Sequence, residues 1–159
     1  MPTVPFNTLR AASVHIAYEV EQMLYCSHQM ERADALVEPL SQADYNVYLT
    51  AFVSHARCLK EFLFKTTKRE PTDMLAVDYL PKNVSLDQLD PELEERLAAV
   101  WKLASVTVAH LSYCRDVAER KWDFHRIQDD LLEVLGQFVA LVPRECLHSD
   151  LQKYRRTAA

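Results

Sequence analysis

Residues 45–63, which read YNVYLTAFVSHARCLKEFL, decide the fold class of this chain. Their apolar residues recur every three or four positions, as they do on the buried face of an α-helix. A helix of that length spans about 30 Å, the width of a small domain. The stretch therefore predicts a central core helix, whose apolar positions are Tyr45, Tyr48, Leu49, Phe52, Val53, Ala56, Leu59, Phe62 and Leu63.

The composition of the whole chain also favours helices. There is one glycine among 159 residues, so there is little material for tight turns between strands, and glycine-rich phosphate loops are excluded. The 49% hydrophobic and 26% charged residues exclude disordered and low-complexity classes. A chain of this length fits one domain. We therefore predict a single all-α domain over residues 1–159, with frayed ends at about 1–7 and 150–159.

Three further long amphipathic helices are predicted around the core helix. The first spans about 8–34, the third about 91–117, and the last runs from 123 to 142, where Pro143 stops it. Residues that cap helix N-termini precede three of the four helices, at Ser41, Asp90 and Asp123. These boundaries predict a bundle of four long amphipathic helices.

Shorter elements are expected between and after the long helices. A short helix is predicted over 72–80 with Thr72 as its N-cap, followed by a loop over 81–90. A further short turn is expected over 146–154. Gly136 lies inside the last long helix, where it favours a close helix crossing or a kink. The predicted architecture is thus four long helices plus a short one.

The charge of the chain argues against some partners. The formal net charge of −5 disfavours nonspecific binding to nucleic acid and to anionic membranes. Two short basic runs keep RNA open as a partner, although a solvated surface is the simpler alternative. They are Lys65, Lys68 and Arg69, and Lys153, Arg155 and Arg156.

The cellular location is predicted from the amino end and the cysteines. Residues 1–7 contain two prolines and no apolar run flanked by positive charge, so they do not resemble a signal peptide. No stretch is apolar enough to span a membrane. The four cysteines form no CxxC pair, which favours reduced and mostly buried thiols at Cys26, Cys58, Cys114 and Cys146. We expect a cytoplasmic protein without a membrane partner.

Two pairs of metal-ligating residues each share one helical face. His55 and Cys58 lie three residues apart on the core helix, and His110 and Cys114 lie four apart on the next long helix. Facing each other, the pairs would form a tetrahedral zinc site. The alternative is that the cysteines are buried and the histidines are satisfied core residues. Apart from this zinc alternative, no metal or cofactor is expected.

Cationic side chains also fall close to two apolar stripes. Arg57 lies inside the core helix, Arg115 follows Leu111 by four residues on the next stripe, and His110 flanks that stripe. A cation near a core needs a partner, so Arg57, His110 and Arg115 are candidates for an anion-binding cleft. The alternative is structural neutralisation, for example of Arg57 by Glu61 one turn later.

The start of the last long helix carries a motif at residues 120–125, RKWDFH. In an all-α domain of this size, this motif resembles the HEPN superfamily, in which an Arg and a His with four to six residues between them lie near a late helix. The resemblance implies a helical bundle, often dimeric, whose active members are metal-independent ribonucleases. It also implies that Arg120 binds the scissile phosphate and that His125 is the acid or base. The chain departs from the family at Lys121, where a polar Asn, Asp or His is usual, and a solvated helix start is the alternative role.

These patterns lead to one main hypothesis and two alternatives. The main hypothesis is a binding or regulatory module that resembles a HEPN-like domain and forms a homodimer, or binds another protein, through a helix face. The dimer is inferred from the wide apolar stripes at 45–63 and 124–142. The alternatives are a metal-independent ribonuclease that uses Arg120 and His125, and a bundle with a zinc site. The patterns leave open whether the chain is an enzyme.

Overall fold

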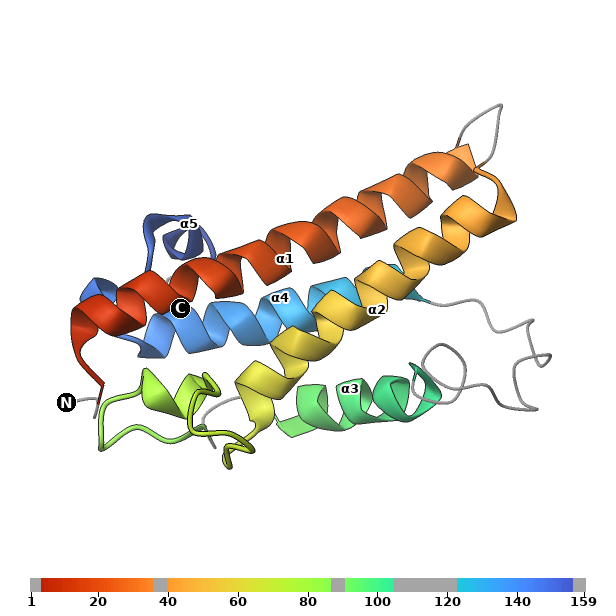
Figure 1. Ribbon diagram of the computed structural model, residues 1–159. Helices are drawn as coiled ribbons and strands as arrows, with labels where there is room; N and C mark the ends of the chain where they lie inside the picture. The colour runs from red at the N-terminus through yellow and green to blue at the C-terminus, as the bar shows by residue number, and fades with distance from the viewer. Residues whose placement is uncertain (1–3, 36–39, 87–90, 105–122, 156–159) are drawn as a thin grey trace.

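The computed structural model describes residues 4–35, 40–86, 91–104 and 123–155. Within these ranges the regular structure consists of α-helices and 3-10 turns without strands, which confirms the predicted all-α class. Four of the helices are long and one is short, as Figure 1 shows. The helices are α1 (Phe6–Ala35), α2 (Gln42–Phe64), α3 (Pro91–Ala104), α4 (Phe124–Leu141) and α5 (Ser149–Gln152).

Helices α1 and α2 form an antiparallel hairpin that organises the fold. The two helices lie close together where α1 ends and α2 begins, and they separate toward their other ends (Figure 1). Helix α4 packs against both of them, and α3 contacts α2 and α4. The short α5 packs on α1. In the described ranges no helix is both long and apolar enough to cross a membrane.

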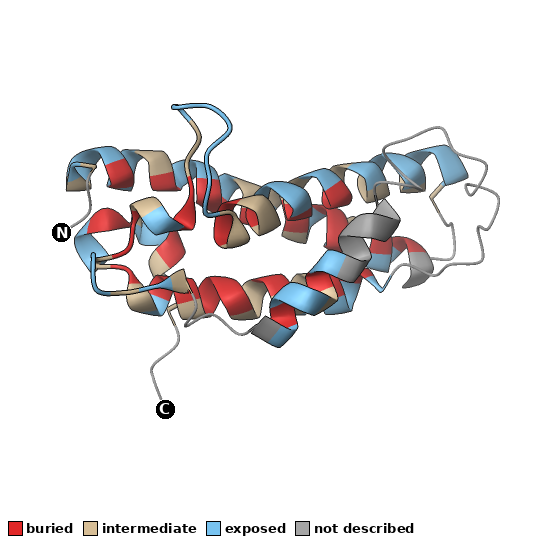
Figure 2. Cartoon of the chain, turned by 90° about the horizontal axis from the view of Figure 1, so that it is seen from below, coloured by how far each residue is buried: buried red, intermediate tan, exposed pale blue. Residues whose placement is uncertain are grey.

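The core lies between α1, α2 and α4, where Figure 2 shows the buried residues turned toward one another. The apolar face predicted for 45–63 is buried from Phe52 onward, whereas Tyr45, Tyr48 and Leu49 are half-buried. The apolar residues predicted for the last long helix are all buried. They are Phe124, Ile127, Leu131, Val134, Leu135, Phe138, Val139 and Val142.

Three aromatic rings meet at the centre of this core. The ring of Phe62 lies edge-on to the rings of Phe138 and Tyr79, at centroid distances of 5.2 Å and 5.9 Å. Tyr79 and Phe138 also contact each other at 5.9 Å. Edge-to-face pairs add about 0.5–1.5 kcal/mol each beyond the area that they bury. The cluster therefore ties the loop after α2 to both α2 and α4.

Helix boundaries largely follow the predicted caps. The Ser41 hydroxyl accepts a hydrogen bond from the backbone N–H of Asp44, and the Asp123 carboxylate accepts one from the N–H of Arg126. Helix α3 begins at Pro91 as predicted, whereas Asp90 and residues 105–117 lie outside the described residues. Gly136 is buried within α4, where the missing side chain favours the close approach of a neighbouring helix.

The prediction of a short helix over 72–80 is wrong. In this range the structure has a 3-10 turn, which covers Ala76–Asp78. Thr72 is not its cap. The Asp73 carboxylate instead accepts hydrogen bonds from the N–H groups of Arg69 and Glu70, and the Asp78 carboxylate accepts one from Leu75. Aspartate side chains that satisfy backbone donors in turns compete with helix formation. Residues 81–85, in the described part of the predicted loop, form a turn and irregular structure, and Leu86 has a 3-10 conformation.

The carboxyl end is ordered further along than the fraying predicted from about residue 150. Pro143 ends α4, and the chain continues through a 3-10 turn, Arg144–Cys146, into α5, where Leu151 is fully buried. The Arg155 guanidinium donates to the carbonyl oxygens of Ala140 and Val142, which lie at the end of α4. These bonds satisfy acceptors that a helix C-terminus leaves free, and they hold the chain in place as far as Arg155.

Candidate functional site

A small cavity opens between α1 and α2, in the part of the hairpin where the two helices separate. Its volume is about 200 Å³. Each helix contributes three of its lining residues, and the loop after α2 contributes the last one. They are His15, Ile16, Glu19, Cys58, Leu59, Phe62 and Met74. The wall is thus apolar at Ile16, Leu59, Phe62 and Met74 and polar at the other three residues.

Glu19 is the centre of the polar part of this cavity. Its Oε2 atom lies 2.8 Å from Nδ1 of His55, which reaches across from α2. The two side chains are 26% and 20% exposed, so the contact is partly shielded from water. The His55 ring also lies edge-on to Tyr18, at a centroid distance of 6.0 Å. The pair therefore links α1 to α2 at the edge of the cavity.

Cys58 is a neutral thiol in this environment. Burial raises its pKa first, and the adjacent Glu19 carboxylate, which hydrogen-bonds the thiol, raises it further. A nucleophilic cysteine needs the opposite, a pKa lowered by a cation or a helix N-terminus. The cavity is thus better suited to binding a ligand than to covalent catalysis by Cys58.

The far wall of the cavity is held in place by Tyr79. The Tyr79 hydroxyl donates to the carbonyl oxygen of Leu9 at 3.1 Å and lies 2.9 Å from the sulfur of Met74. Burial raises the pKa of Tyr79 far above its usual value, so this hydroxyl keeps its proton. The loop after α2 is thereby fixed to α1 with Met74 facing the cavity.

A second surface feature lies on the same hairpin. In the described part of the chain, four of the five exposed large apolar residues belong to α1 and α2, and they are Val14, Tyr18, Tyr25 and Val47. Tyr18 and Tyr25 are each 52% exposed. The Tyr25 ring lies edge-on to Tyr48 of α2, at a centroid distance of 6.3 Å. We define the tyrosine face as Tyr18, Gln22, Tyr25, Val47, Tyr48 and Ala51, none of which carries a charge.

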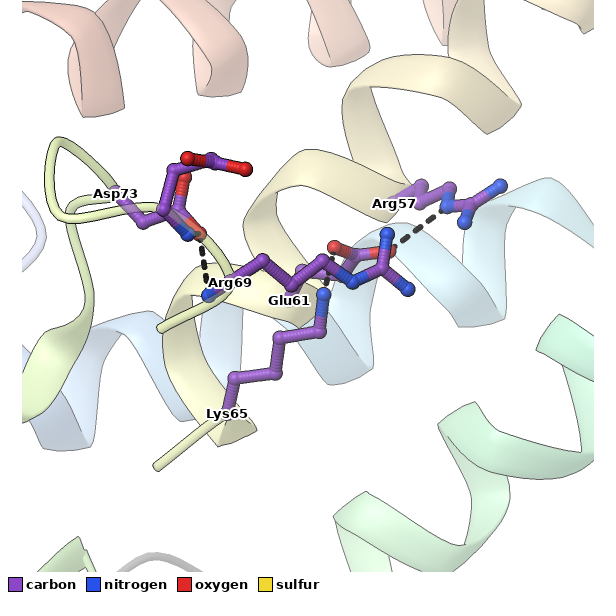
Figure 3. Close-up of polar contacts among 6 residues, drawn as sticks. Arg57, Glu61, Lys65, Arg69 and Asp73 are labelled. Atoms are coloured by element: carbon purple, nitrogen blue, oxygen red, sulfur yellow. Dashed lines mark hydrogen bonds and ion pairs between the residues drawn. The ribbon is translucent and has the colours of Figure 1, made fainter. Parts of the chain in front are cut away.

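The predicted anion-binding cleft finds no support at Arg57. This side chain is 47% exposed, and its Nε donates to Glu61 Oε1 at 2.9 Å, as the structural alternative predicts. Lys65 pairs with the other oxygen of the same carboxylate (Figure 3). Arg57 is exposed on α2, outside the buried stripe. His110 and Arg115, the other predicted members, lie outside the described residues.

Most cations of the two basic runs form ion pairs or hydrogen bonds with other groups of the chain. Lys68 pairs with Asp78 at 2.8 Å, and Lys153 lies 3.6 Å from Glu21. Lys65 and Arg155 are held by Glu61 and by backbone carbonyls, as described above. The backbone N–H of Arg69 donates to the Asp73 carboxylate (Figure 3). Most of these cations are thus paired within the chain, and Arg156 lies outside the described residues.

The zinc alternative requires two residue pairs, of which the structure describes one. His55 is bonded to Glu19, and Cys58 is exposed, unlike Cys26 and Cys146, which are buried. Across the described ranges, no three His, Cys, Asp or Glu side chains are grouped so that they could hold a metal ion. His110 and Cys114 lie outside those ranges, so the zinc site stays a prediction.

The structure describes His125, which is one of the two residues of the predicted ribonuclease pair. His125 lies exposed in the first turn of α4, and its ring packs on that of Phe124 at a centroid distance of 4.3 Å. Asp123, which directly precedes Phe124, is the N-cap of α4. Arg120 and Lys121 lie outside the described residues, so the geometry of the pair stays a prediction.

The sequence patterns did not single out Glu19 or His15 as site residues. Glu19 directly precedes the buried Val20 and follows the buried Ile16 by three positions, so its carboxylate lies at the edge of the core stripe. A carboxylate at such an edge needs a partner, and this is the signal that would have found it. Its pairing with His55 depends on how α1 and α2 pack.

Comparison of the chain with models of known protein families, with curated proteins and with solved structures finds no match.

Proposed function

We propose that this chain is a helical binding or regulatory module, similar to a HEPN-like domain, that acts as a homodimer in the cytoplasm. The observation that carries the proposal is the uncharged tyrosine face on the α1–α2 hairpin. Exposed aromatic residues with no charges among them are typical of the central part of protein interfaces.

The charge of the chain limits where a second copy can bind. Each copy carries a formal net charge of −5, so two copies repel each other at long range. Repulsion is weakest where the surface itself is uncharged, as at Tyr18, Gln22 and Tyr25. A twofold axis through the tyrosine face would bring the same residues of both copies together. The stripe on α4, in contrast, is already buried in the core.

Sedimentation equilibrium over a range of protein concentrations tests the dimer. A reversible monomer–dimer equilibrium is expected, and only monomer at the highest soluble concentration would overturn the dimer. Mixing with a cell extract after such a result would be the route to a different protein partner.

A metal-independent ribonuclease is the second candidate function. The observation that favours it is the exposed position of His125 in the first turn of α4, where its imidazole is accessible to a substrate. A helix N-terminus also attracts anions such as phosphate groups. In this function Arg120 would bind the scissile phosphate and His125 would transfer the proton.

A further inference from the structure

We propose that the cavity between α1 and α2 binds the cationic end of an alkylammonium or alkylguanidinium group, with Glu19 as its counter-ion. This binding site is independent of the proposed dimer, because Glu19, Leu59 and Phe62 all belong to one chain.

The size of the cavity limits what it can hold. Pockets for drug-sized molecules measure about 300–1,000 Å³. At about 200 Å³ this cavity fits a single group of the size of a lysine or arginine side chain. The cationic end could therefore belong to a free small molecule or to a side chain of another protein.

The charge of the lining selects a cation. Glu19 is the one carboxylate among the lining residues, and no lysine or arginine lines the cavity. A carboxylate offers about four acceptor positions on its two oxygens. His55 and the Cys58 thiol each use one of them, which leaves acceptor positions for a ligand.

The apolar wall selects the stem that carries the cation. Ile16, Leu59 and Phe62 are buried side chains at the base of the cavity, and Met74 covers one end. Long cationic side chains bury their methylene stems on such surfaces while the charged head reaches a polar rim. A ligand with both parts would satisfy the apolar and the charged side of the cavity together.

His15 supplies a further contact at the rim. Its imidazole has no hydrogen bond or ion pair with any residue that the structure describes. A neutral imidazole carries one donor and one acceptor. It can therefore accept a hydrogen bond from one N–H of an ammonium or guanidinium group while another N–H donates to Glu19, which lies one turn further along α1.

Methyl NMR of the intact protein with small probes tests the site. The probes are butylguanidinium and butylammonium, and the neutral control is butylurea, which has the same stem and nearly the same shape as butylguanidinium. The Met74 methyl signal, assigned with Met74→Leu, is expected to shift with saturation for the cations. Butylurea is expected to bind about tenfold more weakly or less, because it lacks the charge.

Two variants and two peptides complete the test. Glu19→Gln keeps the shape and removes the charge, so the preference for cations over butylurea should disappear, whereas Glu21→Gln, at an exposed position on α1, should keep it. Cys58→Phe fills the cavity and should abolish binding of every probe; because Cys58 is exposed, the variant should fold. An acetylated Gly-Arg-Gly amide and its citrulline counterpart test the protein side chain as a source.

The outcomes distinguish a small-molecule ligand from a side chain of a partner protein, and they also include results that would overturn the proposal. Binding of the free cations indicates a small-molecule ligand, and binding of the arginine peptide alone indicates a side chain of a partner protein. Equal binding of butylurea and butylguanidinium, an unchanged preference in Glu19→Gln, or no binding of any probe or peptide would overturn the proposal. These readouts stay valid whether the chain sediments as a monomer or a dimer.

Discussion

Oε2 of Glu19 on α1 lies 2.8 Å from Nδ1 of His55 on α2, and this contact joins the two helices beside the cavity. Below it, toward the loop that contains Met74, the separated helices leave the cavity. On the other side of the pair, toward the end of α1 and the start of α2, lies the ring contact of Tyr25 with Tyr48 in the tyrosine face. The pair thus stands between the two surface features of the hairpin.

A double-mutant cycle should show that Glu19 and His55 stabilise the fold together. A hydrogen bond to a charged, partly buried group contributes about 1.5–3 kcal/mol. We expect a coupling free energy of about 1–2 kcal/mol from urea unfolding of Glu19→Ala, His55→Ala and the double variant. The matched control is His28 with Glu31, 3.9 Å apart and 62% and 59% exposed. Its coupling should stay below about 0.5 kcal/mol, and equal values for both pairs would contradict the interpretation.

Ser13 is expected to anchor the carboxyl end of the chain. Its buried hydroxyl donates to the carbonyl oxygen of Arg10 at 2.8 Å and accepts from the backbone N–H of His148 at 2.7 Å. Ser13→Ala leaves that N–H without its partner, which costs about 1–3 kcal/mol in unfolding free energy. Ser54→Ala, at an exposed position on α2, is the control and should change stability by less than about 0.5 kcal/mol. Hydrogen exchange at Leu151 should rise in Ser13→Ala alone.

The helical fold was predictable because it depends on local patterns. The apolar spacing of 45–63 and the caps at Ser41 and Asp123 are properties of neighbouring residues, and the structure confirms all three. The turn at 72–80 was missed because two aspartates bind backbone N–H groups there instead of capping a helix.

The candidate site was less predictable because its partners are far apart in sequence. Glu19 and His55 come from different helices, and Ser13 and His148 are joined only by the packing of the chain end on α1. A one-dimensional pattern can place His55 on a helix, but it does not show which side chain of α1 faces it. Tertiary packing determines that pairing.

Glu61 should give the stability of the fold a dependence on pH in the acidic range. Partial burial raises the pKa of Glu61, but hydrogen bonds from Lys65 and Arg57 outweigh burial and lower it below its usual value. A carboxylate whose pKa is lowered on folding stabilises the protein above its unfolded pKa, and this stabilisation is lost as the pH falls through the folded pKa.

We therefore expect Glu61→Gln to be less stable than the natural chain at pH 7, by less than about 1 kcal/mol, because these are half-exposed helical ion pairs. The difference should vanish as the pH falls below about 4. Urea unfolding at several pH values measures it. In a chain that also carries Arg57→Gln and Lys65→Gln, Glu61→Gln should have no such effect, and a persistent one would point to another cause.

Tyr25→Lys should weaken the proposed dimer. In a twofold interface the substitution places two new positive charges near each other and removes an aromatic contact with Tyr48. We expect dimer dissociation to become at least about tenfold easier in sedimentation equilibrium. Val77→Lys is the control, because Val77 is the exposed apolar residue of the described chain that lies off the hairpin. Equal weakening by both variants would place the interface elsewhere.

The ribonuclease alternative makes its own prediction at His125. If this residue transfers the proton, RNA cleavage should continue in the presence of a chelator and fall at least about 100-fold in His125→Ala. Because the imidazole is exposed on the first turn of α4, the variant should keep the circular dichroism and unfolding midpoint of the natural chain. His28→Ala, an exposed histidine on α1, is the matched control and should cleave normally. Cleavage that survives in His125→Ala would come from a contaminant or from other residues, and absence of cleavage in every RNA tested would leave the binding module as the remaining function.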